Sequence, residues 1–224
     1  MNRPRRYVVG ISGASGAAYA QRLLELLLVG GAEVHLVVSE YGRRLLAEEA
    51  GVSRLEFRQL VPTLVQGAAS GAARHAAAHG ADANELERRL IVHPNKDVGA
   101  VIASGSFLND GMVVIPCSST TLGALATGAG SNLLTRAGMV ALKERRRLII
   151  CHREMPLSLV DIENYRTLTL AGAIICPTNP GFYLNPLSVG DLVDMVVGKV
   201  LDLLGFEHTL ATRWDGRVPD GGRA

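Results

Sequence analysis

Residues 7–16 read Tyr-Val-Val-Gly-Ile-Ser-Gly-Ala-Ser-Gly, an apolar run that ends in glycines and serines. Valine and isoleucine favour a buried strand here, and the amphipathic pattern of residues 17–28 predicts that a helix follows directly. The glycines allow a tight turn and a close approach to a ligand, while the first N–H groups of a helix attract an anion. The stretch therefore predicts a strand, a ligand-accessible turn and a helix.

The same alternation continues along the chain. Buried strands are predicted at Tyr7–Ile11, Val34–Val38, Met112–Ile115, Leu148–Cys151 and Ala173–Cys176. Helices are predicted at Ala17–Leu28, Tyr41–Ala50, Thr121–Thr127, Leu133–Glu144, Leu159–Leu170 and Val189–Leu204. Strands that alternate with helices imply right-handed crossovers and a central parallel sheet covered on both faces. We expect a single doubly wound α/β domain of the Rossmann or flavodoxin type, whose ligands bind beyond the carboxyl ends of the strands.

The domain is expected to span residues 1–212. Within it, residues 67–82 are rich in Ala and Gly and predict an inserted loop or short helix. His75 and His79 stand four residues apart there, but no third ligand is placed beside them, so no metal site is predicted. Residues 213–224 predict a frayed C-terminal tail, with Trp214 as a candidate anchor at its start.

Composition narrows the function classes. Lys and Arg number 23 and Asp and Glu 21, a formal charge of +2, which argues against a nucleic-acid-binding protein. The N-terminal apolar stretch ends after about five residues, too short for a signal peptide or a membrane span. Cys117, Cys151 and Cys176 lack the spacing of a disulfide framework or a zinc ribbon, and we expect buried thiols in a reducing cytoplasm.

The glycines of the first turn leave two interpretations open. Gly10, Gly13 and Gly16 are spaced G-x-x-G-x-x-G, which is not the G-x-G-x-x-G dinucleotide fingerprint, and no Walker lysine follows. The turn is either a plain strand–helix connection capped by Ser15 or a cradle for a phosphate or flavin.

Polar and charged residues follow the later strands. Residues 118–121 read Ser-Ser-Thr-Thr at a predicted helix start, more hydroxyls than capping needs, which favours binding of a phosphate or a polar heterocycle. Arg153 and Glu154 follow the fourth predicted strand, where side chains reach the ligand edge. Residues 177–186 form a loop framed by Pro and Gly around an aromatic pair, which suits either an apolar substrate wall or a packed structural loop.

Ordered sequence blocks carry a resemblance to a known family. They are Gly-Ile-Ser-Gly-Ala-Ser-Gly (10–16), Val-Val-Ser (37–39), Ser-Gly-Ser (104–106), Pro-Cys-Ser (116–118), Asn-Leu-Leu-Thr-Arg-Ala (132–137), Ala-Leu-Lys-Glu-Arg-Arg (141–146), Arg-Glu-Met-Pro-Leu (153–157), Pro-Gly-Phe-Tyr (180–183) and Leu-Asp-Leu-Leu-Gly (201–205). In this order they resemble the flavin prenyltransferase (UbiX/Pad1) family, which shares the fold of the flavin-containing cysteine decarboxylases. The resemblance covers nearly the whole chain, apart from residues 67–82 and the end of the tail.

This resemblance implies a metal-independent enzyme that takes reduced FMN and dimethylallyl phosphate. The prenyl group is joined to flavin N5, and a fourth ring is closed through C6. The product, prenylated FMN, passes to a UbiD-type decarboxylase. The resemblance also implies a homo-oligomer, commonly a dodecamer, with sites at subunit junctions. No nucleic-acid or membrane partner is expected.

The resemblance assigns roles to individual residues. Those that would bind FMN are Gly13, Ala14, Ser15, Ser39, Ser118, Ser119, Thr120, Thr121 and Arg136. Those that would bind the prenyl phosphate are Lys143, Arg153, Tyr183 and Lys199. Fixed cations stabilise charge on a leaving phosphate, and they would replace Mg²⁺ here because the chain has no DDxxD motif.

Four residues are implied to be catalytic. Ser15 would lie near flavin N5, and Lys143 would bind the leaving phosphate. Glu49 and Glu154 would handle protons and orient the cations, although Glu49, next to Glu48, could also be an ordinary acid on a helix surface.

Three other functions compete with this one. A flavin-dependent decarboxylase acting on a cysteinyl substrate shares the first turn, but its Pro-Ala-Ser-Ala-Asn-Thr stretch is Pro-Cys-Ser-Ser-Thr-Thr here. A non-catalytic flavin-binding accessory subunit of a decarboxylase would leave the phosphate-site cations without a role. An NAD oxidoreductase is disfavoured by the glycine spacing. One residue departs from the family pattern, because Lys199 stands where many members carry Arg; it keeps the charge but loses the bidentate geometry.

Overall fold

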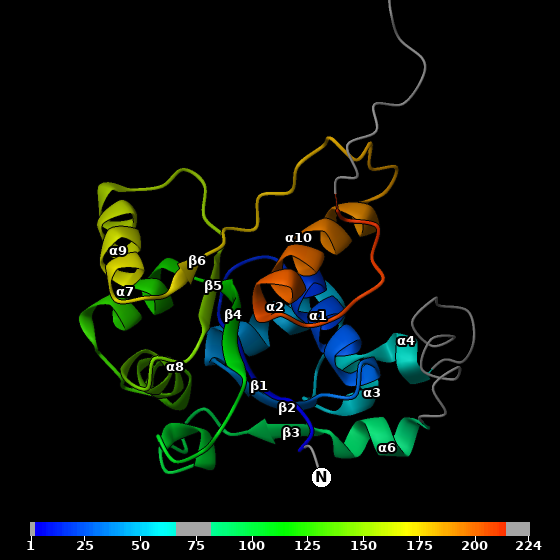
Figure 1. Ribbon diagram of the computed structural model, residues 1–224, viewed down its shortest axis with the longest axis horizontal. Helices are drawn as coiled ribbons and strands as arrows, with labels where there is room; N and C mark the ends of the chain where they lie inside the picture. Colours follow the sequence, from blue (N-terminus) through cyan, green and yellow to red (C-terminus); the bar gives the residue numbers. More distant parts are fainter. Residues whose placement is uncertain (1–2, 66–81, 214–224) are drawn as a thin grey trace, which may run out of the picture.

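Six parallel strands form a single central sheet in the computed structural model (Figure 1). The structure describes residues 3–65 and 82–213. The strands are β1 (Arg6–Ile11), β2 (Glu33–Val38), β3 (Leu90–His93), β4 (Gly111–Cys117), β5 (Leu148–His152) and β6 (Ile174–Ile175). Their order in the sheet is β3-β2-β1-β4-β5-β6, and each neighbouring pair is parallel.

Helices fill the connections between the strands. They are α1 (Ala17–Val29), α2 (Glu40–Ala50), α3 (Phe57–Leu60), α4 (Pro62–Val65), α6 (Ala83–Arg88), the 3₁₀ helix η1 (Val101–Ala103), α7 (Ser119–Thr127), α8 (Leu133–Lys143), α9 (Leu159–Leu170) and α10 (Val189–Leu204). None of the helices in the described part of the chain is long and apolar enough to cross a membrane.

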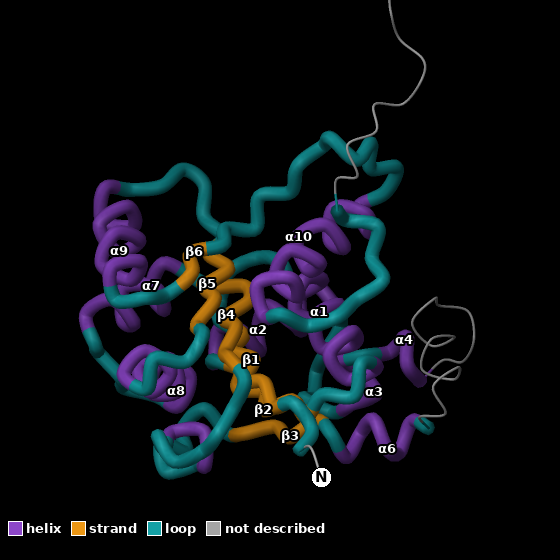
Figure 2. Tube along the Cα trace, in the orientation of Figure 1, coloured by secondary structure: helices purple, strands orange, loops and turns teal. Residues whose placement is uncertain are grey.

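The sheet is covered on both faces, as Figure 2 shows with α1 and α10 on one side and α7, α8 and α9 on the other. The core beneath α1 and α10 includes Leu27 and Val197, which are fully buried with Val9 of β1. The opposite core places Leu134 of α8 among buried residues that include Val114 of β4. Because side chains alternate along a strand, each buried strand supplies both cores, which explains its unbroken apolar sequence.

Local capping signals set the starts of three long helices. Asn132 begins α8, Ser158 begins α9 and Ser188 begins α10, each through a side chain that accepts a hydrogen bond from the third backbone N–H of its helix. In each case the third helical residue also bonds back to the N-terminal cap, which completes a capping box. These helices therefore begin where the sequence pattern predicted.

The predicted fold class is confirmed, with one strand more than expected. β3 at the sheet edge was not predicted from the sequence, and neither were the short elements α3, α4, α6 and η1. β3 has only four residues, and its first three are half-exposed, so its apolar signal is weak. Most of the predicted insertion at residues 67–82, with His75 and His79, lies outside the described residues, as does Trp214.

Candidate functional site

The strand order places a topological switch point between β1 and β4. From β1 the sheet grows through β2 to β3 on one side and through β4 to β6 on the other. In open α/β sheets, the crevice at such a reversal, beyond the carboxyl ends of the strands, is where ligands bind. The turns after β1 and β4 are therefore the expected site.

Ser12 links these two turns through hydrogen bonds. Its hydroxyl donates to the Pro116 carbonyl at 3.2 Å and accepts from the Ser118 backbone N–H at 2.8 Å. Its own N–H also donates to Pro116 at 3.1 Å, and its side chain is buried. Ser12 belongs to the glycine turn, but no role was predicted for it from the sequence. Its position as the first hydroxyl after a buried strand was the available signal.

The turn from β1 into α1 requires its glycines. A Cβ at Gly13 would lie 2.4 Å from Cβ of Tyr41 in the first turn of α2, so the backbone could not pass there with a side chain. Gly16 has φ of +133°, a conformation that other residues rarely adopt, and it is the N-terminal cap of α1. No side chain of α1's own turn caps this helix, so the interpretation of Ser15 as the cap is wrong.

Glu49 caps α1 from a distance in sequence. Its Oε2 accepts hydrogen bonds from the backbone N–H groups of Gly16 and Ala17, both at 2.9 Å. Burial acts to raise the pKa of Glu49, but hydrogen bonds from Ser15, Ala17 and Gly16 and the charge of Arg153 together lower it. Glu49 is thus an ionised carboxylate held at the glycine turn, which is not the setting of an ordinary surface acid such as its neighbour Glu48.

The four consecutive hydroxyls after β4 have different environments. Ser118 is the N-terminal cap of α7 and accepts from the Thr121 N–H at 3.3 Å. Ser119 Oγ lies 3.0 Å from Nε2 of His152, and Thr121 is buried. Thr120 is exposed. The run therefore combines structural bonds with one surface hydroxyl. Ser39 is likewise used as a cap, since its Oγ accepts from the Gly42 N–H at 3.0 Å.

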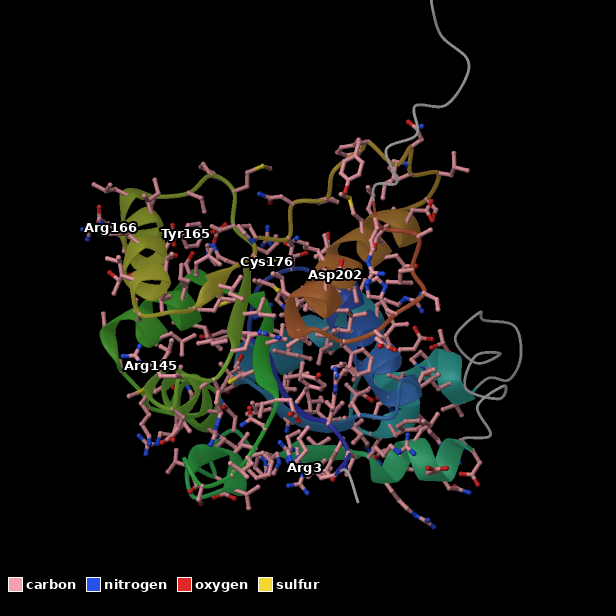
Figure 3. All side chains as sticks on the ribbon, viewed as in Figure 1. Arg3, Arg145, Tyr165, Arg166, Cys176 and Asp202 are labelled. Carbon is pink, nitrogen blue, oxygen red and sulfur yellow. The ribbon has the colours of Figure 1, made fainter. Side chains whose placement is uncertain are left out.

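Behind the hydroxyl run lies a buried polar chain that sequence reasoning missed. Nδ1 of His152 is 2.7 Å from the hydroxyl of Tyr165 on α9, a residue labelled in Figure 3. Burial lowers the pKa of His152. At the start of the same helix, Asp161 has its pKa lowered to about 2 by hydrogen bonds from the Ser158 hydroxyl and N–H and from Ser119. Ser119 is therefore held from two sides, which fixes the first turn of α7.

Arg153 brings a positive charge to this edge. Its backbone N–H donates to the Cys117 carbonyl at 3.1 Å, so it stands directly beside the turn after β4. Its Nε is buried and has no hydrogen-bond partner among the described residues. A buried guanidinium N–H without a partner is costly, and an anionic ligand would satisfy it. Glu154 follows in an exposed position, and Arg136 is half-buried in the first turn of α8.

Lys143 lies at the other end of the sheet. The N-terminus of α8 is near the carboxyl end of β3, because the Leu133 N–H donates to the Asn95 carbonyl at 2.9 Å. The helix has 11 residues, or about 16 Å, and Lys143 ends it close to the start of β5. The Lys143 side chain is 54% exposed and pairs with Glu144, beside Gly105.

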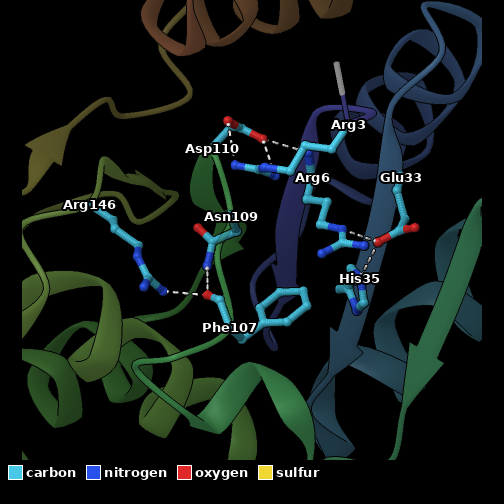
Figure 4. Close-up of polar contacts among 8 residues, drawn as sticks. All are labelled: Arg3, Arg6, Glu33, His35, Phe107, Asn109, Asp110 and Arg146. Carbon is cyan, nitrogen blue, oxygen red and sulfur yellow. Dashed lines mark hydrogen bonds and ion pairs between the residues drawn. The ribbon is translucent and has the colours of Figure 1, made fainter. Parts of the chain in front are cut away.

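Hydrogen bonds hold the segment that contains Gly105 at the amino end of the sheet, where β5 starts. Arg146 donates to the Gly105 carbonyl and, as Figure 4 shows, to the Phe107 carbonyl at 2.6 Å. In the same view Arg6, the first residue of β1, pairs with Glu33 of β2 at 2.7 Å. Lys143 and Arg153 are thus at opposite ends of the sheet within one chain.

Tyr183 and Lys199 lie together. Both line a cavity of about 270 Å³ between the loop after β6 and α10, together with Cys176, Met195 and Asp202. Figure 3 labels Cys176 and Asp202, which mark this region beside α10. Within one protomer, Lys143 is therefore far from Arg153, whereas the loop that carries Tyr183 starts beside β5, because the Thr178 N–H donates to the His152 carbonyl at 3.2 Å. No group of three or more metal-ligating side chains occurs in the part of the chain that the structure describes.

Comparison with known proteins places this geometry in a family. The family described as Flavoprotein matches residues 1–201. The chain is 43% identical to flavin prenyltransferase UbiX of Halalkalibacterium halodurans, over 93% of this chain and 92% of the relative. The chain belongs to the UbiX flavin prenyltransferases. The predicted family and prenyltransferase class are confirmed.

Solved structures of UbiX proteins have the same fold. AnUbiX (PadA1), in complex with FMN and dimethylallyl pyrophosphate, superposes with a TM-score of 0.75 at 34% identity, covering 96% of this chain and all of that one. A dodecameric FMN-dependent UbiX-like decarboxylase from Escherichia coli O157:H7 gives a TM-score of 0.75 at 34% identity, with 95% and 100% covered. An FMN-dependent cysteine decarboxylase, TvaF, is only 14% identical with a TM-score of 0.53, a likeness of fold alone.

Proposed function

We propose that this chain joins the dimethylallyl group of an allylic phosphate to N5 and C6 of reduced FMN, giving prenylated FMN. The observation that carries the proposal is the buried Nε of Arg153, which has no hydrogen-bond partner among the described residues and stands beside the turn after β4. The AnUbiX complex, which holds FMN together with dimethylallyl pyrophosphate, supports both ligand classes.

The flavin would bind across the turns after β1, β2 and β4. Gly13, Ala14 and Ser15 offer a turn with little side-chain bulk, and Thr120 offers an exposed hydroxyl. We assign Ser39, Ser118, Ser119 and Thr121 to shaping this cradle through their capping and buried bonds, with Arg136 as its cation. These residues fit a flavin, because a planar polar heterocycle and its phosphate need small residues, hydroxyl donors and a positive charge.

Reduced FMN supplies the nucleophilic atoms, and the protein's work is to bind phosphate and hold protons. Arg153 would donate to the leaving phosphate and stabilise its charge as the allylic C–O bond breaks. Glu49 is already ionised and in contact with Ser15, so it can accept a proton near the reacting edge. Glu154, exposed beyond β5, would serve as the second proton acceptor. The charge of the phosphate would be balanced by Arg153, Lys143 and Lys199, without a metal.

A complete phosphate site requires more than one copy of the chain. Lys143 is exposed at the amino end of the sheet, while Arg153 is at the carboxyl end. A homo-oligomer, as in the dodecameric relative, would let Lys143 of one copy meet the carboxyl edge of another copy, where Arg153, Tyr183 and Lys199 lie. Exposed apolar side chains on α9 and on the loop before α10, among them Leu159, Val160 and Leu187, suit such contacts.

We propose the cytoplasm as the compartment and a UbiD-type decarboxylase as the acceptor of the product.

The test is an anaerobic incubation with reduced FMN and either dimethylallyl phosphate or the diphosphate, followed by mass spectrometry of the extracted flavin. One added prenyl unit is expected with at least one donor, and comparison of the two separates them. Arg153→Ala should abolish the product, whereas Arg58→Ala, on the exposed surface of α3, should not. Bound but unmodified FMN with both donors would overturn the proposal and favour the accessory-subunit alternative.

A further inference from the structure

Two cysteines stand side by side at the carboxyl ends of β5 and β6. Ile150 pairs with Ile175 in the parallel register, so the next residues, Cys151 and Cys176, are opposite one another. The Cys176 N–H continues the ladder by donating to the Ile150 carbonyl at 2.9 Å. Neighbouring strands are about 4.8 Å apart, and residues opposite one another project to the same face. That spacing is inside the range of about 4.4–6.8 Å between Cα atoms that a disulfide spans.

The two thiols influence each other's protonation. A hydrogen bond between them raises the pKa of Cys151 and is the largest cause lowering the pKa of Cys176. Both side chains belong to the core on the α1–α10 side of the sheet. No large backbone movement is therefore needed to bring the sulfur atoms together.

The surroundings of the two thiols differ in exposure and in nearby charge. Cys151 is fully buried, and burial further raises its pKa. Cys176 is partly exposed and lines the 270 Å³ cavity with Lys199. The hydrogen bond from Cys151 and the charge of Lys199 outweigh its burial and lower the pKa of Cys176 to about 7. A partly exposed thiolate next to a cation is the form of cysteine that peroxides attack.

The third cysteine is an internal comparison. Cys117 is fully buried within β4, and burial raises its pKa far above the ordinary value. It lies outside the set of residues that line the cavity. A reagent that reacts according to access and thiolate character should therefore reach Cys176 first and leave Cys117 unmodified.

We propose that Cys176 is a peroxide-reactive thiol and that Cys151 resolves it to an intrachain disulfide. The Cys176 thiolate attacks hydrogen peroxide, breaking the O–O bond to give a sulfenic acid and hydroxide. The Cys151 sulfur then attacks the sulfenic sulfur, its proton leaves with the displaced hydroxide as water, and the S–S bond forms. The two thiols lose two electrons in total, and the peroxide is reduced to two waters.

The first test uses the folded wild-type protein and a small excess of hydrogen peroxide. The intact mass should fall by two hydrogen atoms, and non-reducing peptide mapping should give one linked peptide that joins Cys151 to Cys176. Dithiothreitol should restore the starting mass. An unchanged mass, oxygen added elsewhere in the chain, or a linkage that involves Cys117 would overturn the proposal. None of these measurements depends on transferase activity, so this inference and the proposed function can fail separately.

Variants assign the two roles. Cys151→Ser should stop the reaction at a Cys176 sulfenic acid, which dimedone traps, and Cys176→Ser should remove both the trap and the disulfide. Cys117→Ser should behave as the wild type. Dimedone trapping at Cys176 that persists in the wild type, without disulfide, would contradict the resolving role of Cys151.

A final measurement tests the cation without any cysteine substitution. Lys199→Ala removes the nearby positive charge, so the pKa of Cys176 should rise and its alkylation by iodoacetamide at neutral pH should slow several-fold. Lys96→Ala, on the exposed loop after β3, is the matched control and should leave the rate unchanged. Equal rates for the two lysine variants would remove Lys199 from the proposal.

Discussion

Glu49 Oε2 lies 2.9 Å from the backbone nitrogen of Ala17, so a carboxylate near the end of α2 caps the first turn of α1. A helix N-terminus at a glycine turn is an ordinary place for a ligand phosphate. Here those N–H groups donate to Glu49 instead. Phosphate groups are therefore expected nearer Arg153, whose Nε is buried, and the α1 turn is left to approach the flavin ring.

Removal of this cap should lower the stability of the fold. Glu49→Ala leaves two N–H groups without their acceptor and should lower the free energy of unfolding by about 1 kcal/mol. Glu49→Gln keeps an oxygen acceptor but loses the charge that favours a helix N-terminus, so a smaller loss is expected. Urea unfolding at one fixed protein concentration measures both. Glu48→Gln is the matched control, and an equal effect at Glu48 would show that Glu49 is an ordinary surface acid.

The cap of α9 predicts a dependence of stability on pH. The pKa of Asp161 is lowered to about 2 from its ordinary value of 3.8, so its stabilising effect is complete above the ordinary value and is lost as the pH falls through about 2. Asp161→Asn should lower the thermal midpoint at pH 6, and the difference from the wild type should shrink toward pH 2. Glu163→Gln, an exposed change on the same helix, should give no such convergence. A constant difference between Asp161→Asn and the wild type over this range would contradict the assignment.

The close contact at Gly13 predicts a loss of flavin affinity. An added Cβ would meet Cβ of Tyr41 at 2.4 Å, so Gly13→Ala must displace the turn that is proposed to face the flavin. We expect FMN affinity to fall by at least about tenfold, or about 1.4 kcal/mol, measured by quenching of flavin fluorescence. Gly190→Ala, in the first turn of α10, meets only the Ser188 hydroxyl at 3.4 Å and should bind FMN normally. Normal affinity of Gly13→Ala would separate this turn from the flavin site.

The sequence predicted most of the fold because each strand is apolar along its whole length. β4 is buried at every position, and its run of Val and Ile could be recognised without knowledge of its neighbours. β3 could not, because an edge strand buries fewer side chains and its four residues lie between a charged helix and Pro94. Its existence depends on pairing with β2, which is a contact between distant parts of the chain.

The site was predicted less completely than the fold, for a physical reason. Motifs predict residues near a ligand, and Ser15 and Arg153 were proposed in this way; their roles stay predictions. Cap and clamp roles depend on distances across the fold: Glu49 reaches α1 over 32 residues and Ser12 reaches Pro116 over 104. The same limit applies to His152, whose partners Ser119 and Tyr165 come from two different helices.

The separation of Lys143 from Arg153 predicts complementation between inactive variants. Lys143→Ala and Arg153→Ala should each abolish prenylation when present in every chain. If the two side chains in one site come from different copies, mixed oligomers contain some sites in which both are intact. With equal amounts and random assembly, about a quarter of the sites should be complete.

Co-expression of the two variants with different affinity tags, followed by purification on both tags, gives the mixed oligomers whose flavin product is measured. Arg136→Ala mixed with Arg153→Ala is the comparison, since both residues belong to the carboxyl end of one protomer, and it should stay inactive. Inactivity of the Lys143 and Arg153 mixture, in oligomers shown to contain both chains, would mean that α8 must move Lys143 to Arg153 within a single protomer.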